Sequence, residues 1–288
     1  MSVRTRQVTV ITDSAAALSQ EQIDEFQLHV ARMEIVIDGS AFIDGPDGDL
    51  SDFYSKLESS VEIPTTSAPK PAEYLEIFRS AAAVSHTIFC VTVSGRLSAS
   101  NDAARVAVDL LADELPKTVV RVFDSETAAS SQALIVLAAA RAAAEGGTLE
   151  AVEAAATVVA EKIRLVAMLD TLRYIHKSGR VPKIAVWVTS ALNIKPVMEF
   201  STGKIGAIAR PRSVARALNR ILKEMRHDLD GKRAHVNVIH AGAPERAEVL
   251  RSWASDNLDC AELFVTQFHP FMGAHTGPGL VGASWWAE

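Results

Sequence analysis

Short apolar runs rich in β-branched residues alternate along the chain with longer segments of helical periodicity. The runs Val8–Thr12, Thr87–Val93 and Thr118–Phe123 each have the length and composition of a buried strand. Helical patterns fill the intervals between them, including one that begins at Pro71, where proline suits the first turn, and one over residues 101–111. This alternation is typical of an α/β protein with largely parallel sheets.

Two local signals predict how the first elements begin and turn. Ser19 followed by Gln22 fits a capping box, which predicts a helix from about Gln20 to Leu28. Asp38-Gly39 is a favoured pair for a type I′ turn, and it joins two short apolar runs. The sequence therefore predicts a β-hairpin around this pair.

The second half of the chain repeats the alternation after a long alanine-rich segment. Residues 127–163 predict two helices that are split at Gly146-Gly147, and strands and helices follow to about Ser284. We place the domain boundary where the paired helices end, giving an N-terminal domain over residues 1–163 and a C-terminal domain over residues 164–288. The predicted fold is a two-domain α/β protein: a largely parallel N-terminal sheet flanked by helices, and a smaller mixed α/β C-terminal domain.

Composition excludes several classes of function. The 288 residues carry a net charge of -6, which argues against a nucleic-acid-binding surface. The most apolar stretch, Ala133 to Ala144, is interrupted by Arg141 and is too short to cross a bilayer, so we expect no transmembrane segment. The first residues lack the apolar core of a signal peptide. Cys90 and Cys260 are expected as buried free thiols, and the cytoplasm is the expected location.

Polar residues cluster at the ends of three predicted strands. These steps are Thr12-Asp13-Ser14, Thr92-Val93-Ser94-Gly95 and Asp124-Ser125. Ligands bind beyond the carboxyl ends of strands in open α/β sheets, so the repetition indicates a shared crevice. Asp and Ser also make caps and turns, which is the alternative interpretation.

Two further segments combine hydroxyls or an imidazole with proline and glycine. They are Pro64-Thr65-Thr66-Ser67-Ala68-Pro69 and His275-Thr276-Gly277-Pro278-Gly279, in which glycine and proline favour tight turns. Together with Ser94, they indicate a pocket that holds an anion with hydroxyls and one imidazole, without a metal.

These motifs, taken in order, resemble the bacterial DegV family of fatty-acid-binding proteins. The resemblance spans nearly the whole chain and also includes residues 172–181, with Ser178-Gly179-Arg180, and Leu192-Asn193-Ile194-Lys195-Pro196. It implies two α/β domains, an acyl chain buried in a tunnel, and a carboxylate near the domain interface. It also implies a separate ATP-dependent fatty acid kinase, to which this chain presents the acid for phosphorylation to an acyl-phosphate used in phospholipid synthesis. The chain would then be a binding subunit with no cofactor and no chemistry of its own.

The resemblance also assigns roles to individual residues. Thr66, Ser94 and His275 would bind the carboxylate, and Arg180, Arg212 and His275 would lie at the mouth where phosphoryl transfer occurs. The loops that support them would contain Asp13, Ser14, Ser67, Gly95, Thr276 and Gly277. Two departures affect this pattern: Arg96-Leu97 stand where the family usually has Thr-Tyr, and Ser178 replaces a glycine.

Several alternatives remain open at the level of sequence. Another apolar ligand, such as a sterol or retinoid, would use the same kind of pocket. A serine hydrolase would use Ser94 with His275, although Val-Ser-Gly lacks the nucleophile elbow of that class. A zinc site would use His235, His240, His269 and His275, but His235 and His240 should point to opposite faces of one strand. Arg180 with His176, Lys177 and Lys183 forms either a phosphoryl-binding cluster or a solvated basic loop.

Overall fold

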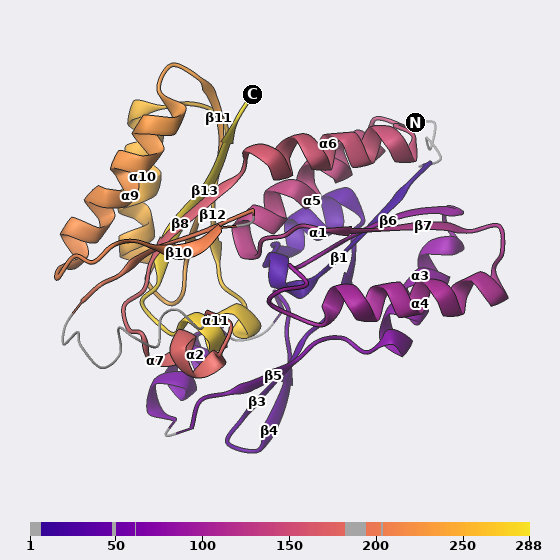
Figure 1. The fold of residues 1–288 in the computed structure, drawn as a ribbon, viewed down its shortest axis with the longest axis horizontal. Helices are drawn as coiled ribbons and strands as arrows, with labels where there is room; N and C mark the ends of the chain where they lie inside the picture. Colours follow the sequence, from indigo (N-terminus) through magenta and orange to yellow (C-terminus); the bar gives the residue numbers. More distant parts are fainter. Residues whose placement is uncertain (1–6, 48–49, 61, 182–193, 203) are drawn as a thin grey trace.

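The computed structural model of the chain contains three β-sheets with helices packed around two of them (Figure 1). It describes residues 7–47, 50–60, 62–181, 194–202 and 204–288. The four-stranded sheet and its helices form one side of the molecule in Figure 1, and the six-stranded sheet forms the other. A three-stranded sheet projects at the lower edge, below the junction between them.

The first sheet is entirely parallel and belongs to the N-terminal part of the chain. Its order is β2-β1-β6-β7, with β1 Thr9–Asp13, β2 His29–Ala31, β6 Thr87–Thr92 and β7 Val119–Asp124. One face packs on α3 and α4, through Ile11, Ile88 and Cys90. The bounds of the N-terminal helices that flank this sheet are α1 Gln20–Phe26, α3 Pro71–Ala82 and α4 Ser100–Glu114.

The second sheet is mixed and lies in the C-terminal part. Its order is β10-β9-β8-β13-β11-β12, in which only β11 and β12 run parallel. The strands are β8 Arg164–Met168, β9 Val197–Ser201, β10 Lys204–Ala209, β11 Arg233–His240, β12 Asp259–Gln267 and β13 Val281–Ala287. Helices α9 Val214–Leu229 and α10 Pro244–Asn257 cover its outer face.

Alternate residues of β8 serve the two faces of this sheet, as the period of a strand requires. Val166 and Met168 pack with the core under α9 and α10. Leu165, Ala167 and Leu169 belong instead to the core cluster that faces the rest of the molecule. That inner face becomes important for the candidate site.

Two alanine-rich helices lie between the large sheets. They are α5 Ala129–Ala144 and α6 Leu149–Lys162, and α5 contacts β1 and β6 on one side and β8, β11 and β13 on the other. The first turn of α5 is buried, and Ser130 and Ser131 both bond to Ser284 of β13 through their hydroxyls. Helix α5 therefore ties the two sheets together.

The three-stranded sheet is antiparallel, with β3 Glu34–Ile37 in the middle. Its outer strands are β4 Ser40–Ile43 and β5 Thr65–Ser67, and α2 Leu50–Ser59 comes between them in the chain. Asp38 and Gly39 both have positive φ, as a type I′ turn needs, so the predicted hairpin is confirmed. The short helices α7 Arg173–Ser178 and α11 Pro270–Thr276 complete the region around this sheet.

Most predicted elements are present, and a few expectations are wrong. The capping box of Ser19 and Gln22 is formed, and Pro71 begins its helix. The predicted tight turn after His275 is formed at Gly277 to Gly279, whereas the helix α11 that carries His275 in its last turn was not predicted. Cys260 is only partly buried, unlike Cys90. The boundary at residues 163/164 stays a prediction.

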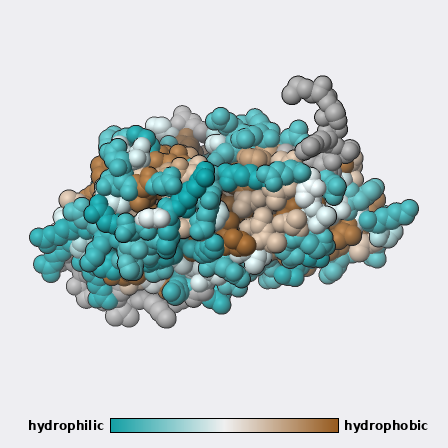
Figure 2. Space-filling model, turned by 90° about the horizontal axis from the view of Figure 1, so that it is seen from above, coloured by the Kyte–Doolittle hydropathy of each residue, from teal (hydrophilic) through white to brown (hydrophobic). Residues whose placement is uncertain are grey.

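The helices in the described ranges include none with both the length and the apolarity needed to cross a membrane. Figure 2 shows one face of the molecule covered mainly by hydrophilic residues, with hydrophobic residues visible in several separate areas. Val158 of α6 and Val119 of β7 are among the large apolar side chains that remain exposed.

Candidate functional site

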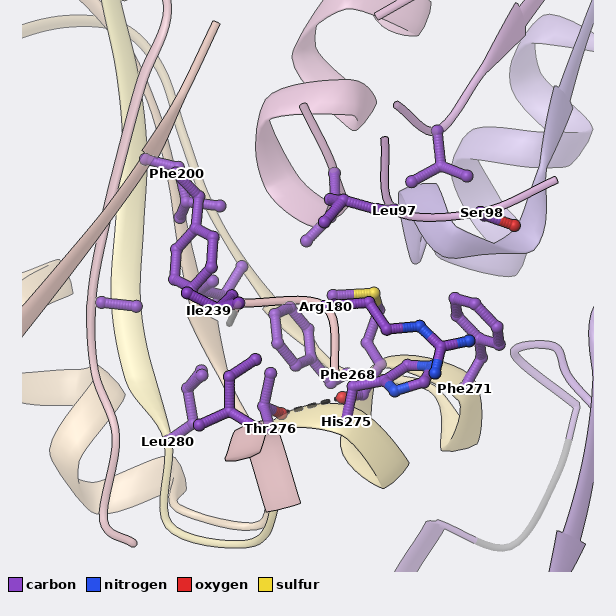
Figure 3. Close-up of a pocket in the computed structure, with 18 residues that line it drawn as sticks. Leu97, Ser98, Arg180, Phe200, Ile239, Phe268, Phe271, His275, Thr276 and Leu280 are labelled. Atoms are coloured by element: carbon purple, nitrogen blue, oxygen red, sulfur yellow. Dashed lines mark hydrogen bonds between the residues drawn. The ribbon is translucent and has the colours of Figure 1, made fainter. Parts of the chain in front are cut away.

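An apolar pocket lies where the inner face of the six-stranded sheet meets α5, α11 and the loop after β6 (Figure 3). Its cavity volume is about 60 Å³, and the space not filled by atoms reaches about 650 Å³ when the part open to solvent is included. Such pockets with few polar groups are the usual form of small-molecule sites. The residues that line it are Val93, Leu97, Ser98, Ala128, Ala129, Leu165, Ala167, Ile175, Arg180, Val181, Phe200, Ile239, Phe268, Phe271, Met272, His275, Thr276 and Leu280.

Small residues create the space for this pocket. Ala167 of β8 lies opposite Gly282 of β13, and Gly282 lies opposite Ile239 of β11. A Cβ atom at Gly282 would come within 2.5 Å of the Ala167 Cβ, so the strand there requires glycine. Ala128 and Ala129, at the start of α5, form part of the facing wall. The sheet and the helix are thus prevented from closing on each other.

The polar end of the pocket is formed by His275 and Arg180. Both residues also line an open hollow on the surface, together with Thr66, Lys177 and Ser178. The Oγ1 atom of Thr66, in the middle of β5, is 3.0 Å from Nε2 of His275. The structure therefore brings together two residues 209 positions apart, at the point where the apolar pocket opens to solvent.

His275 is held in a setting that favours its neutral form. Burial lowers the pKa of His275 to about 4, and the charge of Arg180 acts in the same direction. The imidazole also packs edge-on against Phe271, with 4.9 Å between the ring centroids. At neutral pH the unliganded mouth thus contains an uncharged imidazole beside the guanidinium of Arg180.

Helix α11 carries four of the lining residues, and side chains from distant elements fix it in place. The Asp44 carboxylate accepts a hydrogen bond of 2.9 Å from the Phe271 N–H in its first turn. The hydroxyl of Tyr54 in α2 donates to the carbonyl of Phe268, just before the helix. Gly273 packs so closely on α2 that an added Cβ would lie 2.8 Å from the Tyr54 hydroxyl oxygen.

Thr276 and Gly277 support the mouth through the backbone. The Thr276 hydroxyl donates to the Met272 carbonyl at 2.8 Å, which is the dashed contact in Figure 3. Gly277 has φ of +78°, and a Cβ there would lie 2.2 Å from the Tyr174 ring. The Tyr174 hydroxyl donates to the Leu57 carbonyl in α2. Glycine at 277 is thus needed for chain reversal and for the packing of this tyrosine.

The carboxyl edge of the parallel sheet is held by Asp13, which is fully buried. Its carboxylate accepts hydrogen bonds from the Val93 N–H, the Ser100 hydroxyl and the Gln132 amide, at 2.7 to 2.9 Å. Burial raises the pKa of Asp13, although these three donors act against the shift. Asp13 therefore fixes the loop that contains Ser94 and ties it to α5.

Ser94 and Gly95 follow β6 in this loop. The Ser94 N–H donates to the Thr127 carbonyl, and its buried hydroxyl accepts from the Arg96 N–H. Gly95 donates its N–H to Asp124 Oδ2 at 3.1 Å. Ser94 is not among the lining residues, whereas its neighbours Val93 and Ser98 are. A role for Ser94 in carboxylate binding stays a prediction.

The other predicted residues lie at varying distances from the mouth. Ser14 is buried and accepts from the Met33 N–H, and exposed Ser67 donates to Glu34 on the outer side of its sheet. Arg212 is exposed in the turn between β10 and α9 and lines neither the apolar pocket nor the open hollow. Lys183, Leu192 and Asn193 lie outside the described residues.

The geometry of the site also bears on the two alternatives raised by the sequence, a serine hydrolase and a zinc site. The Nε2 atom of His275 contacts Thr66, not Ser94, so this atom does not pair with the proposed nucleophile. His235 contacts Glu262 and Glu288, while His240 accepts from the Ala243 N–H. Within the described ranges, no group of three or more His, Cys, Asp or Glu side chains could hold a metal ion.

Sequence reasoning missed most of the apolar lining, including Leu97, Phe200 and Ile239. An apolar side chain on a strand has the same pattern whether it fills a core or faces a pocket. One usable signal was Gly282, because an isolated glycine in a strand marks a close approach of backbones.

The sequence matches a family model over residues 7–288, described as an uncharacterised protein of the DegV family. A DegV domain-containing protein of Streptomyces coelicolor is 30% identical over 279 residues, which cover 96% of this chain and 97% of that protein. Another from Listeria innocua is 27% identical over 280 residues, or 96% of this chain and 98% of the relative.

Solved structures show the same fold. A DegV family protein from Thermus thermophilus, described as binding fatty acid, aligns with a TM-score of 0.90 and 26% identity over 98% of this chain and all of that one. A stearic acid-binding protein from Eubacterium ventriosum aligns with a TM-score of 0.86 and 23% identity, over 97% and 98% of the two chains. The family match and these alignments span almost the whole sequence, and the chain belongs to the DegV family.

Proposed function

We propose that this protein binds a long-chain fatty acid, with the acyl tail in the apolar pocket and the carboxylate at the mouth. One observation carries the proposal: a pocket lined mainly by apolar side chains opens where Thr66 Oγ1 and His275 Nε2 lie 3.0 Å apart beside Arg180. The description of the Thermus thermophilus relative as a fatty-acid-binding protein supports the same ligand class.

The tail supplies most of the affinity. Burial of one methylene is worth about 0.8 kcal/mol, so about 14 methylenes give on the order of 11 kcal/mol before the costs of association and ordering. Aliphatic and aromatic side chains such as Leu165, Ile239 and Phe268 provide suitable walls. Another apolar ligand of similar width would gain affinity in the same way. If such a ligand were recovered from the protein, the identity of the ligand would change, but the proposed site would stay the same.

The head group fixes the position of the fatty acid along the pocket. The Thr66 hydroxyl donates one hydrogen bond to a carboxylate while its oxygen accepts from the Nε2–H of the neutral His275 imidazole, and Arg180 adds positive charge from the solvent side. Hydrogen bonds to a charged acceptor contribute about 1.5 to 3 kcal/mol each. We include Ser94 as a further donor in this proposal, reached by rotation of its hydroxyl.

The open hollow next to the mouth fits a second step carried out by a partner. An ATP-dependent fatty acid kinase would bring its nucleotide to this hollow, where Lys177 and Arg180 suit a phosphoryl group. Arg212 would then contact the partner. In this proposal the chain is a binding subunit that supplies the carboxylate as nucleophile, and ATP and magnesium belong to the kinase.

Native mass spectrometry of protein purified without added lipid tests the ligand. We expect a mass increment of one fatty acid, which disappears after organic extraction and is identified in the extract. Protein without an increment, which also fails to take up added palmitate, would contradict the proposal. An increment that matches a sterol or another lipid would replace the fatty acid as ligand.

Thr66→Val tests the head group because it keeps the shape of the side chain and removes the hydroxyl. We expect the affinity for palmitate to fall about tenfold, the loss of one charge-assisted hydrogen bond. Ser67→Ala is the matched control, since Ser67 lies on the same strand and donates to Glu34 on the opposite face. Equal affinities for both variants and the wild type would place the carboxylate elsewhere.

A further inference from the structure

We propose that Phe200 closes the deep end of the apolar pocket and thereby sets the longest acyl chain that gains affinity from it. This inference rests on the proposed fatty-acid binding and adds a specificity-determining residue to that site. It comes from the register of the six-stranded sheet, which fixes the direction in which the pocket runs.

The mouth lies at one end of β8. The segment from His275 leads through Gly279 to Leu280, which lines the pocket directly before β13. Val281 pairs with Met168 at the carboxyl end of β8, and the Leu280 carbonyl accepts from the Ala241 N–H just after β11. The residues next to His275 therefore contact the sheet at the Met168 end.

Phe200, in β9, lies beside the other end of β8. Met198 pairs with Ala167, and Glu199 with Val166, so the antiparallel ladder brings Phe200 beside Leu165. The distance from Leu165 to Leu169 along the strand is about 13 Å, at about 3.3 Å per residue. Figure 3 agrees with this direction, since it shows Phe200 on the side of the pocket away from Arg180 and His275.

The surroundings of Phe200 make it an end wall. Its ring points into the pocket in Figure 3, and its carbonyl is fixed by a 2.9 Å hydrogen bond from the Thr127 hydroxyl, directly before α5. The side chain is only half-buried, so one side of it faces the pocket and the other side approaches solvent. Phe200 of β9 and Leu165 of β8 are the residues of these two strands that line the pocket at this end.

A series of saturated fatty acids of increasing length tests the proposal. Each methylene inside the pocket should raise the affinity about fourfold, and this gain should stop at the length at which the chain meets Phe200. In Phe200→Ala the plateau should occur about two to four carbons later, since a phenyl ring fills the space of a few methylenes. In Phe200→Trp it should occur earlier.

Phe271→Ala is the matched control at the opposite end. It removes the same ring from the pocket lining beside His275, so it should weaken binding of every chain by a similar factor and leave the plateau unchanged. A folded state like that of the wild type is checked for each variant by thermal unfolding.

The outcomes separate this inference from the proposed function. If the wild-type protein binds none of the acids, the proposed function is wrong. If it binds them with a plateau that neither Phe200→Ala nor Phe200→Trp moves, the proposed function stands and Phe200 is not the end wall. A plateau that moves equally in Phe271→Ala would also overturn the assignment, because the direction of the pocket would then be wrong.

Discussion

The two large sheets contribute to the pocket in different ways. The four-stranded parallel sheet presents its carboxyl edge, where Asp13 holds the loop after β6 by hydrogen bonds to backbone and side chains. The six-stranded mixed sheet presents a face, on which Leu165, Ala167 and Ile239 form an apolar floor. Polar chemistry positions one wall and close packing positions the other, so changes to the two walls should have different signatures.

Asp13→Ala should have the largest effect, because it removes the acceptor for three buried donors. We expect the free energy of unfolding to fall by about 2 to 4 kcal/mol, measured by urea denaturation. Asp109→Ala, an exposed change on α4, should cost less than about 0.5 kcal/mol. Similar losses of unfolding free energy in both variants would show that the Asp13 carboxylate does not hold the carboxyl edge of the parallel sheet.

Gly282→Ala tests the inner face of the six-stranded sheet, where the added Cβ would lie 2.6 Å from the Val166 carbonyl oxygen. We expect a loss of about 1 to 3 kcal/mol from overpacking, together with weaker fatty-acid binding because the floor must shift. Gly206→Ala is the matched control in β10 of the same sheet, since an added Cβ there meets nothing within 4 Å. If the control lost as much stability, strand propensity and not packing would explain both results.

His275→Gln should have the smallest effect on stability at neutral pH, and its main effect should appear in the pH dependence. Because the folded pKa of about 4 lies below the ordinary 6.5, the unfolded chain binds more protons between these values. This histidine therefore lowers stability as pH falls from 6.5 to 4, by at most about 1.4 kcal/mol per pH unit. We expect a shallower decline in the variant over that window.

The difference in pH dependence between the wild type and His275→Gln isolates the contribution of the imidazole at the mouth. His269, with a pKa lowered to about 4 by burial, acts in the same direction in both. Asp44, with a pKa raised to about 7 by burial, acts in the opposite direction in both, because its folded form retains a proton that the unfolded form releases. Identical slopes would mean that His275 takes up its proton over the same pH range in the folded and unfolded states.

The sequence predicted elements whose cause is local. The capping box at Ser19 and the Asp38-Gly39 turn depend on neighbouring residues, and both are formed. Strands β2 and β5 and helices α2 and α11 were missed because their causes are distant. Helix α11 has seven residues and includes a glycine, and it is stabilised by Asp44 and by packing on α2.

The candidate site was only partly predictable for a similar reason. Polar steps at strand ends identified the edge around Asp13, since parallel strands place their carboxyl ends together. The hydroxyls, imidazole, proline and glycine of their segments grouped Thr66 and His275 in one predicted anion pocket, but their roles at a carboxylate came from the resemblance to a family, because neither residue carries a local signal of the other. The apolar floor gave no signal, since Leu165 and Ile239 would have the same pattern in a solid core.

The place of β13 in the six-stranded sheet has a consequence for biosynthesis. Residues 281–287 lie between β8 and β11, so the sheet cannot join its two halves before this segment leaves the ribosome. Between the synthesis of β8 and that of β13, the edge of β8 that pairs with β13 has no partner, and such unpaired apolar strands are prone to aggregation. The pocket floor, formed by residues of β8 and β11, is therefore complete only after β13 has been synthesised.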